Sequence, residues 1–128
     1  MKWAPVIAAA FLLLPAGAAI ALAPAGDAVR GAQLYKARCG SCHSLDANRV
    51  GPAHRGVVGR KAGSMAGYSY SPAMRASRVV WSPQAIDRYL QNPQQMVPGT
   101  KMGFRLADPG QRADVIAYLQ QQGRTVRK

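Results

Sequence analysis

Apolar side chains recur every three or four residues in a short stretch that ends at the first cysteine, at Ala28, Ala32, Tyr35 and Cys39. This spacing predicts a short amphipathic helix from Asp27 to about Arg38, with the Asp27 carboxylate well placed near its N-terminus. Glycine inside a helix costs about 1 kcal/mol relative to alanine, so we expect Gly31 to permit the close approach of another backbone. The helix would deliver Cys39 at its end.

Two further helices are predicted from a polar residue followed by proline. Ser82-Pro83 and Asp108-Pro109 are each typical of an N-cap residue and a first-turn proline. The first of these helices would end at Asn92-Pro93 and the second at Gly123. The second has a mostly apolar stripe that could cross the first helix of the chain, made of Val115, Tyr118, Leu119 and Gln122, with Ile116 beside them.

Residues 46–71 are dense in Gly, Pro, Asn and Ser and sustain neither a strand period nor a helix period, so we expect a long loop there. Three short helices in a domain of about 100 residues provide little apolar interior. A large apolar prosthetic group would fill the middle and would explain how long loops stay ordered. The pattern predicts an all-α fold, with about three to five short helices and long loops wrapped around one such group.

The beginning of the chain has the composition of a secretory signal peptide. Lys2 precedes an apolar run that ends in alanine-rich small residues. We predict a cleaved signal peptide over residues 1–25 and one exported domain over residues 26–128. The alternative is an uncleaved membrane anchor facing the periplasm, because the run approaches the roughly 20 apolar residues of a spanning helix. Pro15 and Gly17 within the run favour removal.

The chain is strongly basic, with 17 Lys and Arg against 5 Asp and Glu and a net charge of +12. Loss of residues 1–25, in which Lys2 is the only charged residue, would lower this charge to +11. A protein with this excess of positive charge attracts polyanions, acidic protein faces or anionic membranes. The basic residues are spread along the chain and are not interleaved with aromatic residues, so we expect no nucleic-acid partner.

Cys39-Gly40-Ser41-Cys42-His43 is the C-x-x-C-H motif of covalent haem attachment. Its two thiols would add to the haem vinyl groups, and the adjacent His43 would ligate the iron. A zinc site would need a second pair of ligands, and His54 is the only other histidine. A redox dithiol would need a helix that starts at the motif rather than ends there. A structural disulfide is the remaining alternative, and we predict one covalently bound haem c.

The sixth iron ligand distinguishes an electron carrier from a catalyst. A methionine there holds the reduction potential high and blocks small ligands, whereas an open position would admit oxygen, peroxide or carbon monoxide. Met102 is favoured by its place at the end of a constrained loop and just before Phe104. The other candidates are Met65, Met74, Met96 and His54.

Several further segments match those of one protein family in the same order along the chain. They are Gly51-Pro52, Gly59-Arg60-Lys61, Gly67-Tyr68-Ser69-Tyr70, Trp81, Tyr89-Leu90-Gln91-Asn92-Pro93, Pro98-Gly99-Thr100-Lys101-Met102 and Ile116-Ala117-Tyr118-Leu119. With the C-x-x-C-H motif, they make residues 26–128 resemble class I cytochrome c of the mitochondrial type and its bacterial relatives. The resemblance implies the cytochrome c fold around one haem c, with His43 and Met102 as iron ligands.

The resemblance also implies roles for residues around the haem. The Pro52 carbonyl would accept a hydrogen bond from the second ring nitrogen of His43 and so orient the imidazole. Tyr89 and Thr100 would lie near the Met102 sulfur.

A haem propionate would be surrounded by Arg60, Tyr70 and Trp81, because buried negative charge needs hydrogen-bond donors. Without the family, core aromatics and a surface arginine would be the simpler interpretation of these three residues.

Some positions depart from the family pattern. The loop from His43 to Gly51 is shorter than in mitochondrial members, which suggests a bacterial protein. His54 stands where the family commonly has an apolar residue, and it stays a rival ligand although it lies on the His43 side of the sequence. Gln94 and Gln95 replace lysines that mitochondrial relatives use around the exposed haem edge.

These features predict a soluble monohaem carrier in the periplasm, not an enzyme, that passes one electron between respiratory or dehydrogenase partners. We expect redox partners with acidic docking faces, met by Lys36, Lys101 and Arg105. We also expect a monomer, with no stable membrane insertion unless the leader is uncleaved. The alternative is an electron-transfer subunit of a dehydrogenase.

Overall fold

The computed structural model describes Met1 and residues 25–124 of the chain, so the predicted signal peptide lies almost wholly outside the described residues. The helices in chain order are α1 (Ala28–Leu34), η1 (Tyr35–Cys39), α2 (Pro72–Ala76), α3 (Pro83–Gln91), α4 (Pro93–Met96) and α5 (Pro109–Arg124). Extended pairing among the described residues is limited to one isolated bridge, between Lys61 and Val80. The predicted all-α class is confirmed.

Both helix starts predicted from a polar residue and proline are confirmed. The Ser82 hydroxyl accepts a hydrogen bond from the Ala85 amide at 3.1 Å at the start of α3. The Asp108 carboxylate accepts one from the Gln111 amide at 2.8 Å at the start of α5. These side chains satisfy amide groups that have no partner within the helix. The helix α3 ends at Gln91 as expected, and α5 runs one residue beyond the predicted Gly123.

Two short helices are missing from the predicted elements. Ser71 caps α2 by accepting from the Met74 amide at 3.1 Å, and Asn92 caps α4 by accepting from the Gln95 amide at 3.3 Å. Each has the polar residue and proline that also start α3. With 5 and 4 residues, however, they are too short for an apolar period to develop. The Asn92-Pro93 pair therefore ends α3 and starts α4.

The first helix changes its winding before it reaches the C-x-x-C-H motif. The α-helix ends at Leu34, and η1 continues it as a π-helix to Cys39. The Gly40 amide donates to the Tyr35 carbonyl at 2.8 Å, which closes the wider turn. The single helix predicted to about Arg38 is thus wrong in its winding, although Cys39 does lie at its end. Single π turns of this kind are often found at functional sites.

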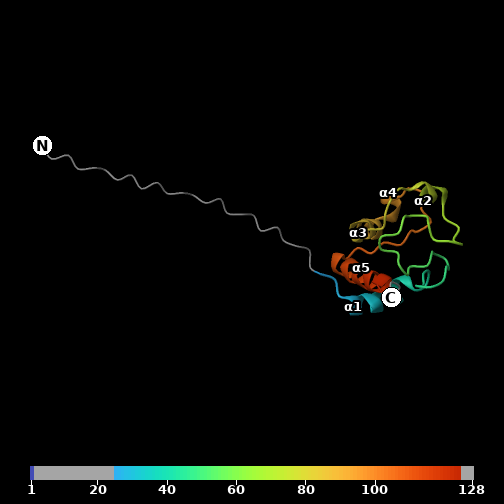
Figure 1. Ribbon diagram of the computed structural model, residues 1–128, viewed down its shortest axis with the longest axis horizontal. Coiled ribbons are helices and arrows are strands. Elements are labelled where there is room, and N and C mark those ends of the chain that lie inside the picture. The colour runs from blue at the N-terminus through green and yellow to red at the C-terminus, as the bar shows by residue number, and fades with distance from the viewer. Residues whose placement is uncertain (2–24, 125–128) are drawn as a thin grey trace.

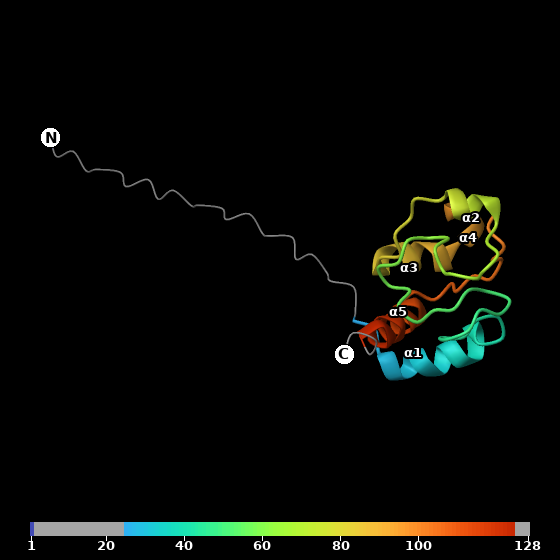
Figure 2. The same cartoon turned by 45° about the vertical axis from the view of Figure 1, so that its right-hand side comes forward.

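The two terminal helices cross, with α1 packed along α5, whereas α2, α3 and α4 lie together on the other side of the molecule (Figures 1 and 2). A Cβ atom at Gly31 would lie 1.9 Å from the Asp114 carbonyl oxygen and 2.9 Å from Tyr118 Cβ. Real Cβ atoms essentially never come this close to other atoms. The expectation that Gly31 permits close backbone approach is therefore confirmed.

A buried carboxylate joins the two helices at this crossing. Asp114 of α5 accepts hydrogen bonds from the Asp27 amide at 2.7 Å and from Arg30 Nε at 2.9 Å. The hydrogen bond from Arg30 is the main reason that the pKa of the Asp114 carboxyl is lowered. Asp27 in turn caps α1 through its side chain. The N-terminal cap and the α1–α5 crossing are therefore held by one polar network.

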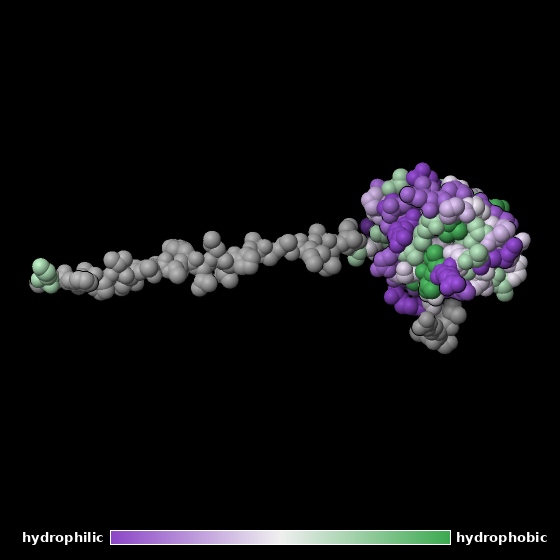
Figure 3. Space-filling model, turned by 90° about the horizontal axis from the view of Figure 1, so that it is seen from above, coloured by the Kyte–Doolittle hydropathy of each residue, from purple (hydrophilic) through white to green (hydrophobic). Residues whose placement is uncertain are grey.

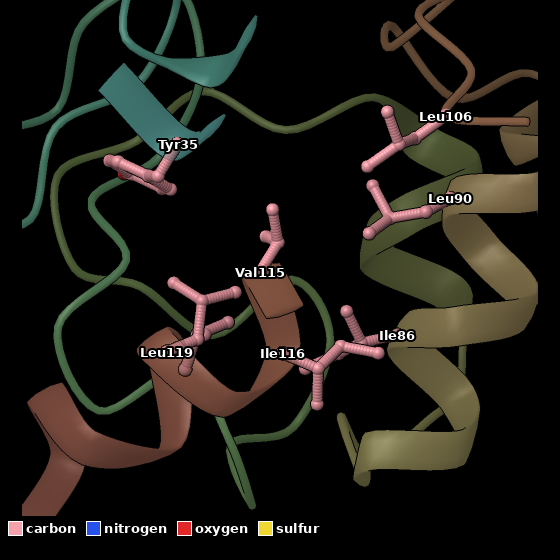
Figure 4. Packing of buried hydrophobic residues seen from close by; sticks show 8 residues of the cluster. Tyr35, Ile86, Leu90, Leu106, Val115, Ile116 and Leu119 are labelled. Atoms are coloured by element: carbon pink, nitrogen blue, oxygen red, sulfur yellow. The ribbon is translucent and has the colours of Figure 1, made fainter. Parts of the chain in front are cut away.

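The main apolar cluster brings together side chains from η1, α3, α5 and the segment before α5. In Figure 4, Ile86 meets Ile116, and Leu90 meets Leu106. Tyr35 lies across from the Leu90–Leu106 pair, with Val115 directed between them. This core therefore joins the terminal helices to α3. No helix in the described part of the chain is long and apolar enough to cross a membrane.

The crossing at Gly31 can be tested by adding one methyl group. We expect Gly31→Ala to lower the free energy of unfolding by about 1–3 kcal/mol, because the backbones must separate. Gly123→Ala is the matched control, since its Cβ would meet only Gly56 Cα, at an ordinary 3.7 Å. Urea titration of both haem-containing variants measures the difference. A Gly31→Ala protein as stable as the Gly123→Ala protein would contradict this account of the crossing.

Candidate cofactor-binding site

A cavity of about 400 Å³ lies between the terminal helices, α3 and the loops. This volume falls within the range of roughly 300–1,000 Å³ that is typical of ligand pockets. Ten residues predicted from the sequence to bind a haem all line it: Cys39, Cys42, His43, Pro52, Arg60, Tyr70, Trp81, Tyr89, Thr100 and Met102. Among the other candidate ligands, Met74 and His54 also line the cavity, whereas Met65 and Met96 are not among its lining residues.

The C-x-x-C-H segment forms a tight turn at the end of η1. The Cys39 carbonyl accepts hydrogen bonds from the Cys42 amide at 3.1 Å and from the His43 amide at 2.9 Å. Cys39 is half-buried and Cys42 exposed, and no disulfide joins them. Burial raises the pKa of the Cys39 thiol to about 11. The described residues contain no group of three or more His, Cys, Asp or Glu side chains that could hold a metal ion.

The His43 ring is oriented by the backbone that faces it. Its Nδ1 lies 2.9 Å from the Pro52 carbonyl oxygen. A carbonyl can only accept, so Nδ1 carries the hydrogen and Nε2 keeps its lone pair. Burial lowers the pKa of His43, which favours this neutral form. A Cβ at Gly51 would lie only 2.1 Å from the ring, so glycine is needed there to admit the imidazole.

The loop that presents Met102 is held by a buried pair of hydroxyl groups. Tyr89 Oη and Thr100 Oγ1 share a hydrogen bond of 2.6 Å. Gln94 Nε2 donates to the Thr100 carbonyl at 2.7 Å and more weakly to the Met102 carbonyl at 3.3 Å. Gly99 has a φ of +91°, which glycine adopts most readily. The sequence indicated a position for Gln94 only at the exposed edge, whereas its amide also holds the Met102 loop.

A set of hydrogen-bond donors lies along another part of the cavity lining. The Trp81 amide donates to the Arg60 carbonyl at 2.9 Å, which holds the two residues side by side. The Arg60 guanidinium is partly buried and donates to the Ala53 carbonyl at 2.7 Å. Its pKa is lowered by burial. The Tyr70 hydroxyl accepts from the Met65 amide at 3.1 Å and keeps its own proton to donate. The Arg60 guanidinium and the Tyr70 hydroxyl could therefore bind a carboxylate group of a ligand.

The second histidine lies against the first. The His43 and His54 rings are stacked, with centroids 3.9 Å apart and planes 20° from parallel. A ligand opposite His43 would have to lie on the other side of the metal, so this position does not favour His54 as the sixth ligand. Burial, together with the nearby His43 and Arg60, lowers the pKa of His54 well below its ordinary value.

The side chains around the cavity fit a covalently bound haem. The two cysteines have the C-x-x-C spacing of haem attachment and line the cavity beside the His43 imidazole, the Met102 thioether lies on a separate loop, and Arg60 would supply a cation for a propionate. The apolar wall consists of residues that also belong to the main core, including Tyr35, Ile86, Leu90, Val115 and Leu119. In the surface view of Figure 3, apolar residues gather near the middle of one face with hydrophilic residues around them.

Comparisons with known proteins agree with this fit. The model of the cytochrome c family matches residues 28–123. Cytochrome c2 of Rhodopila globiformis is 48% identical over 101 residues, which cover 77% of this chain and 95% of that protein. Cytochrome c of Cochliobolus lunatus is 46% identical, with 76% and 94% covered. The solved structure of cytochrome cH from Methylobacterium extorquens has a TM-score of 0.72 and 41% identity, and the match covers 75% of this chain and 99% of that one.

Proposed function

Because the chain belongs to the cytochrome c family of electron-transfer proteins, we propose that it is a monomeric periplasmic carrier that moves single electrons between respiratory or dehydrogenase partners. Family membership itself establishes one covalently attached haem c with its iron, and a role in electron transfer rather than enzymatic catalysis. The observation that carries the proposed haem site is the shared cavity, which is lined by the C-x-x-C-H turn and by Met102.

In this proposal, Cys39 and Cys42 would attach the haem, and His43 and Met102 would bind its iron. A haem iron with two protein ligands supplies a one-electron change of oxidation state. His43 offers its Nε2 lone pair because Pro52 accepts the proton-bearing edge of the ring. The Tyr89–Thr100 hydrogen bond supports the proposal that the Met102 loop keeps one geometry and that its thioether excludes small ligands.

The remaining predicted site residues would bind the periphery of the haem. Arg60, Tyr70 and Trp81 would face a propionate, and the partly buried guanidinium would compensate its negative charge. The apolar core residues that line the cavity would keep water from the iron and so reduce the solvent rearrangement that accompanies electron transfer.

Export is the part of the proposal that depends on residues 1–25. Their sequence supports a signal peptide, removal of which would release residues 26–128 into the periplasm. In the alternative, an uncleaved leader would anchor the same domain to the membrane.

The mouth of the cavity supports docking of a partner with an acidic face. Lys101 and Phe104 both line the cavity and are exposed. The Arg38 guanidinium lies 5.6 Å from the centre of the Phe104 ring. Lys36 and Arg105 do not line the cavity, but both are exposed and each is close in sequence to one of these two residues. Cations around an exposed apolar edge would steer brief encounters without burying many charges. The proposed partners are therefore redox proteins that present carboxylates, with no role for nucleic acid.

Carbon monoxide tests whether the sixth position is held by Met102. We expect the visible spectrum of the reduced protein to stay unchanged when carbon monoxide is added. Met102→Ala should bind the gas promptly, because it lacks the thioether, while keeping the haem attached through Cys39 and Cys42. Met96→Ala is the control, since Met96 does not line the cavity. A prompt Soret shift in the unmodified protein would contradict the proposed ligation.

Charge reversal tests the docking face. We expect the Lys36→Glu/Lys101→Glu/Arg105→Glu variant to react with an acidic redox partner about tenfold or more slowly at low salt, and with a weaker dependence on ionic strength. Stopped-flow mixing measures this rate. The control reverses Arg75 and Arg88, two exposed basic residues on α2 and α3 that are not part of the proposed face. Equal rates and salt dependences in the unmodified protein and the triple variant would contradict the proposal that these residues form the docking face.

A further inference from the structure

His54 occupies the face of the His43 ring rather than a separate part of the cavity. The two imidazoles are 3.9 Å apart between centroids and 20° from parallel, which is a direct stacking contact. The resemblance to the family leads one to expect an apolar side chain at this position, and an apolar side chain could fill the same space. It could not, however, make a directed polar contact on its other side.

That polar contact exists and leads to the terminal helices. Tyr35 Oη and His54 Nδ1 share a hydrogen bond of 3.0 Å. Tyr35 is buried in η1, and its ring lies 5.4 Å from that of Tyr118 in α5. The His54 backbone is fixed too, since its amide donates to the Ser44 carbonyl at 3.0 Å. The His54 ring is therefore held by its own backbone and by a hydroxyl from the α1–α5 side of the molecule.

The His43 ring is thus contacted at its Nδ1 edge by Pro52 and over one face by His54. The hydrogen bond to Pro52 fixes the Nδ1 edge of the ring, but a single hydrogen bond opposes tilting about that edge only weakly. Contact with a flat ring over one face opposes this tilt. We propose that His54 is a positioning residue that fixes the plane of the His43 imidazole and couples it, through Tyr35, to the packing of α1 on α5.

This inference rests on the proposed role of His43 as an axial ligand, because only then does its ring plane affect the haem. Outer-shell partners of metal-bound histidines are known to orient the ring and tune the metal, and they usually act through the hydrogen bond at the second nitrogen. Here a second contact acts on the ring face. A merely structural His54 would fill space and contribute to stability, but it would leave the electronic axes of the iron unchanged.

Proton NMR of the oxidised, haem-containing protein distinguishes these roles. The paramagnetic shifts of haem methyl and axial-ligand protons depend on the plane of the axial imidazole. The variants are His54→Leu, which removes the flat ring but stays apolar, and Tyr35→Phe, which removes only the hydroxyl. Tyr118→Phe is the matched control, because it removes the hydroxyl of a ring packed on Tyr35 without touching the hydrogen bond to His54. Visible spectra confirm that both axial ligands are kept.

We expect His54→Leu to change the spread of the haem methyl shifts and the His43 ring resonances. Tyr35→Phe should change them in the same direction by a smaller amount, and Tyr118→Phe should match the unmodified protein. In the double variant, Tyr35→Phe should add nothing to His54→Leu, because its effect passes through the missing ring. If His54→Leu does not fold, the comparison of Tyr35→Phe with Tyr118→Phe still tests whether the Tyr35 hydroxyl affects the plane of the His43 ring.

Unchanged shifts in both His54→Leu and Tyr35→Phe, with ligation intact, would overturn the inference. Fully additive effects in the double variant would also overturn it, because Tyr35 would then act on the haem by another route. A failure of the underlying function looks different, since the unmodified protein would then lack the resonances of an axial histidine.

Discussion

The rest of the structure depends on how the His43 ring is held against the central cavity. Pro52 accepts a hydrogen bond from one edge of the ring, and Gly51 allows an approach that no Cβ would permit. The same turn begins where η1 ends, so the π-helical winding and the position of the two cysteines are set together. The first helix is in turn fixed by its crossing with α5 at Gly31. The C-x-x-C-H turn, the orientation of the His43 ring and the packing of the chain ends are therefore parts of one arrangement.

The size of the cavity explains why so little regular structure suffices. Cavities in protein cores cost about 24 cal/mol per Å³, so a void near 400 Å³ would cost on the order of 10 kcal/mol. That is comparable to the whole stability of a typical domain. The cost of the empty cavity is an upper bound because part of its lining borders solvent, as the exposed Cys42 and Phe104 show. We therefore expect the haem to complete the apolar core and to order the long loops packed around it.

Features determined locally could be predicted from the sequence, and features that need the folded chain could not. The starts of α3 and α5 follow from a polar residue before proline, and the C-x-x-C-H motif carries its chemistry in five adjacent residues. The helices α2 and α4 have the same start signal but are too short to show a period. The π winding of η1 and the stacking of His54 on His43 depend on contacts that no periodicity encodes. The family resemblance supplied the cavity-lining set, which spacing alone left open.

The most direct test of the central claim is the far-UV circular dichroism spectrum of the chain with and without attached haem. The Cys39→Ala/Cys42→Ala variant, produced without haem, is compared with the haem-containing protein across a thermal scan. If the haem replaces part of the core, the variant loses most of its helical signal and shows no cooperative transition, whereas the haem-containing protein shows both. A haem-free variant with the same helical signal and the same transition midpoint would contradict the account.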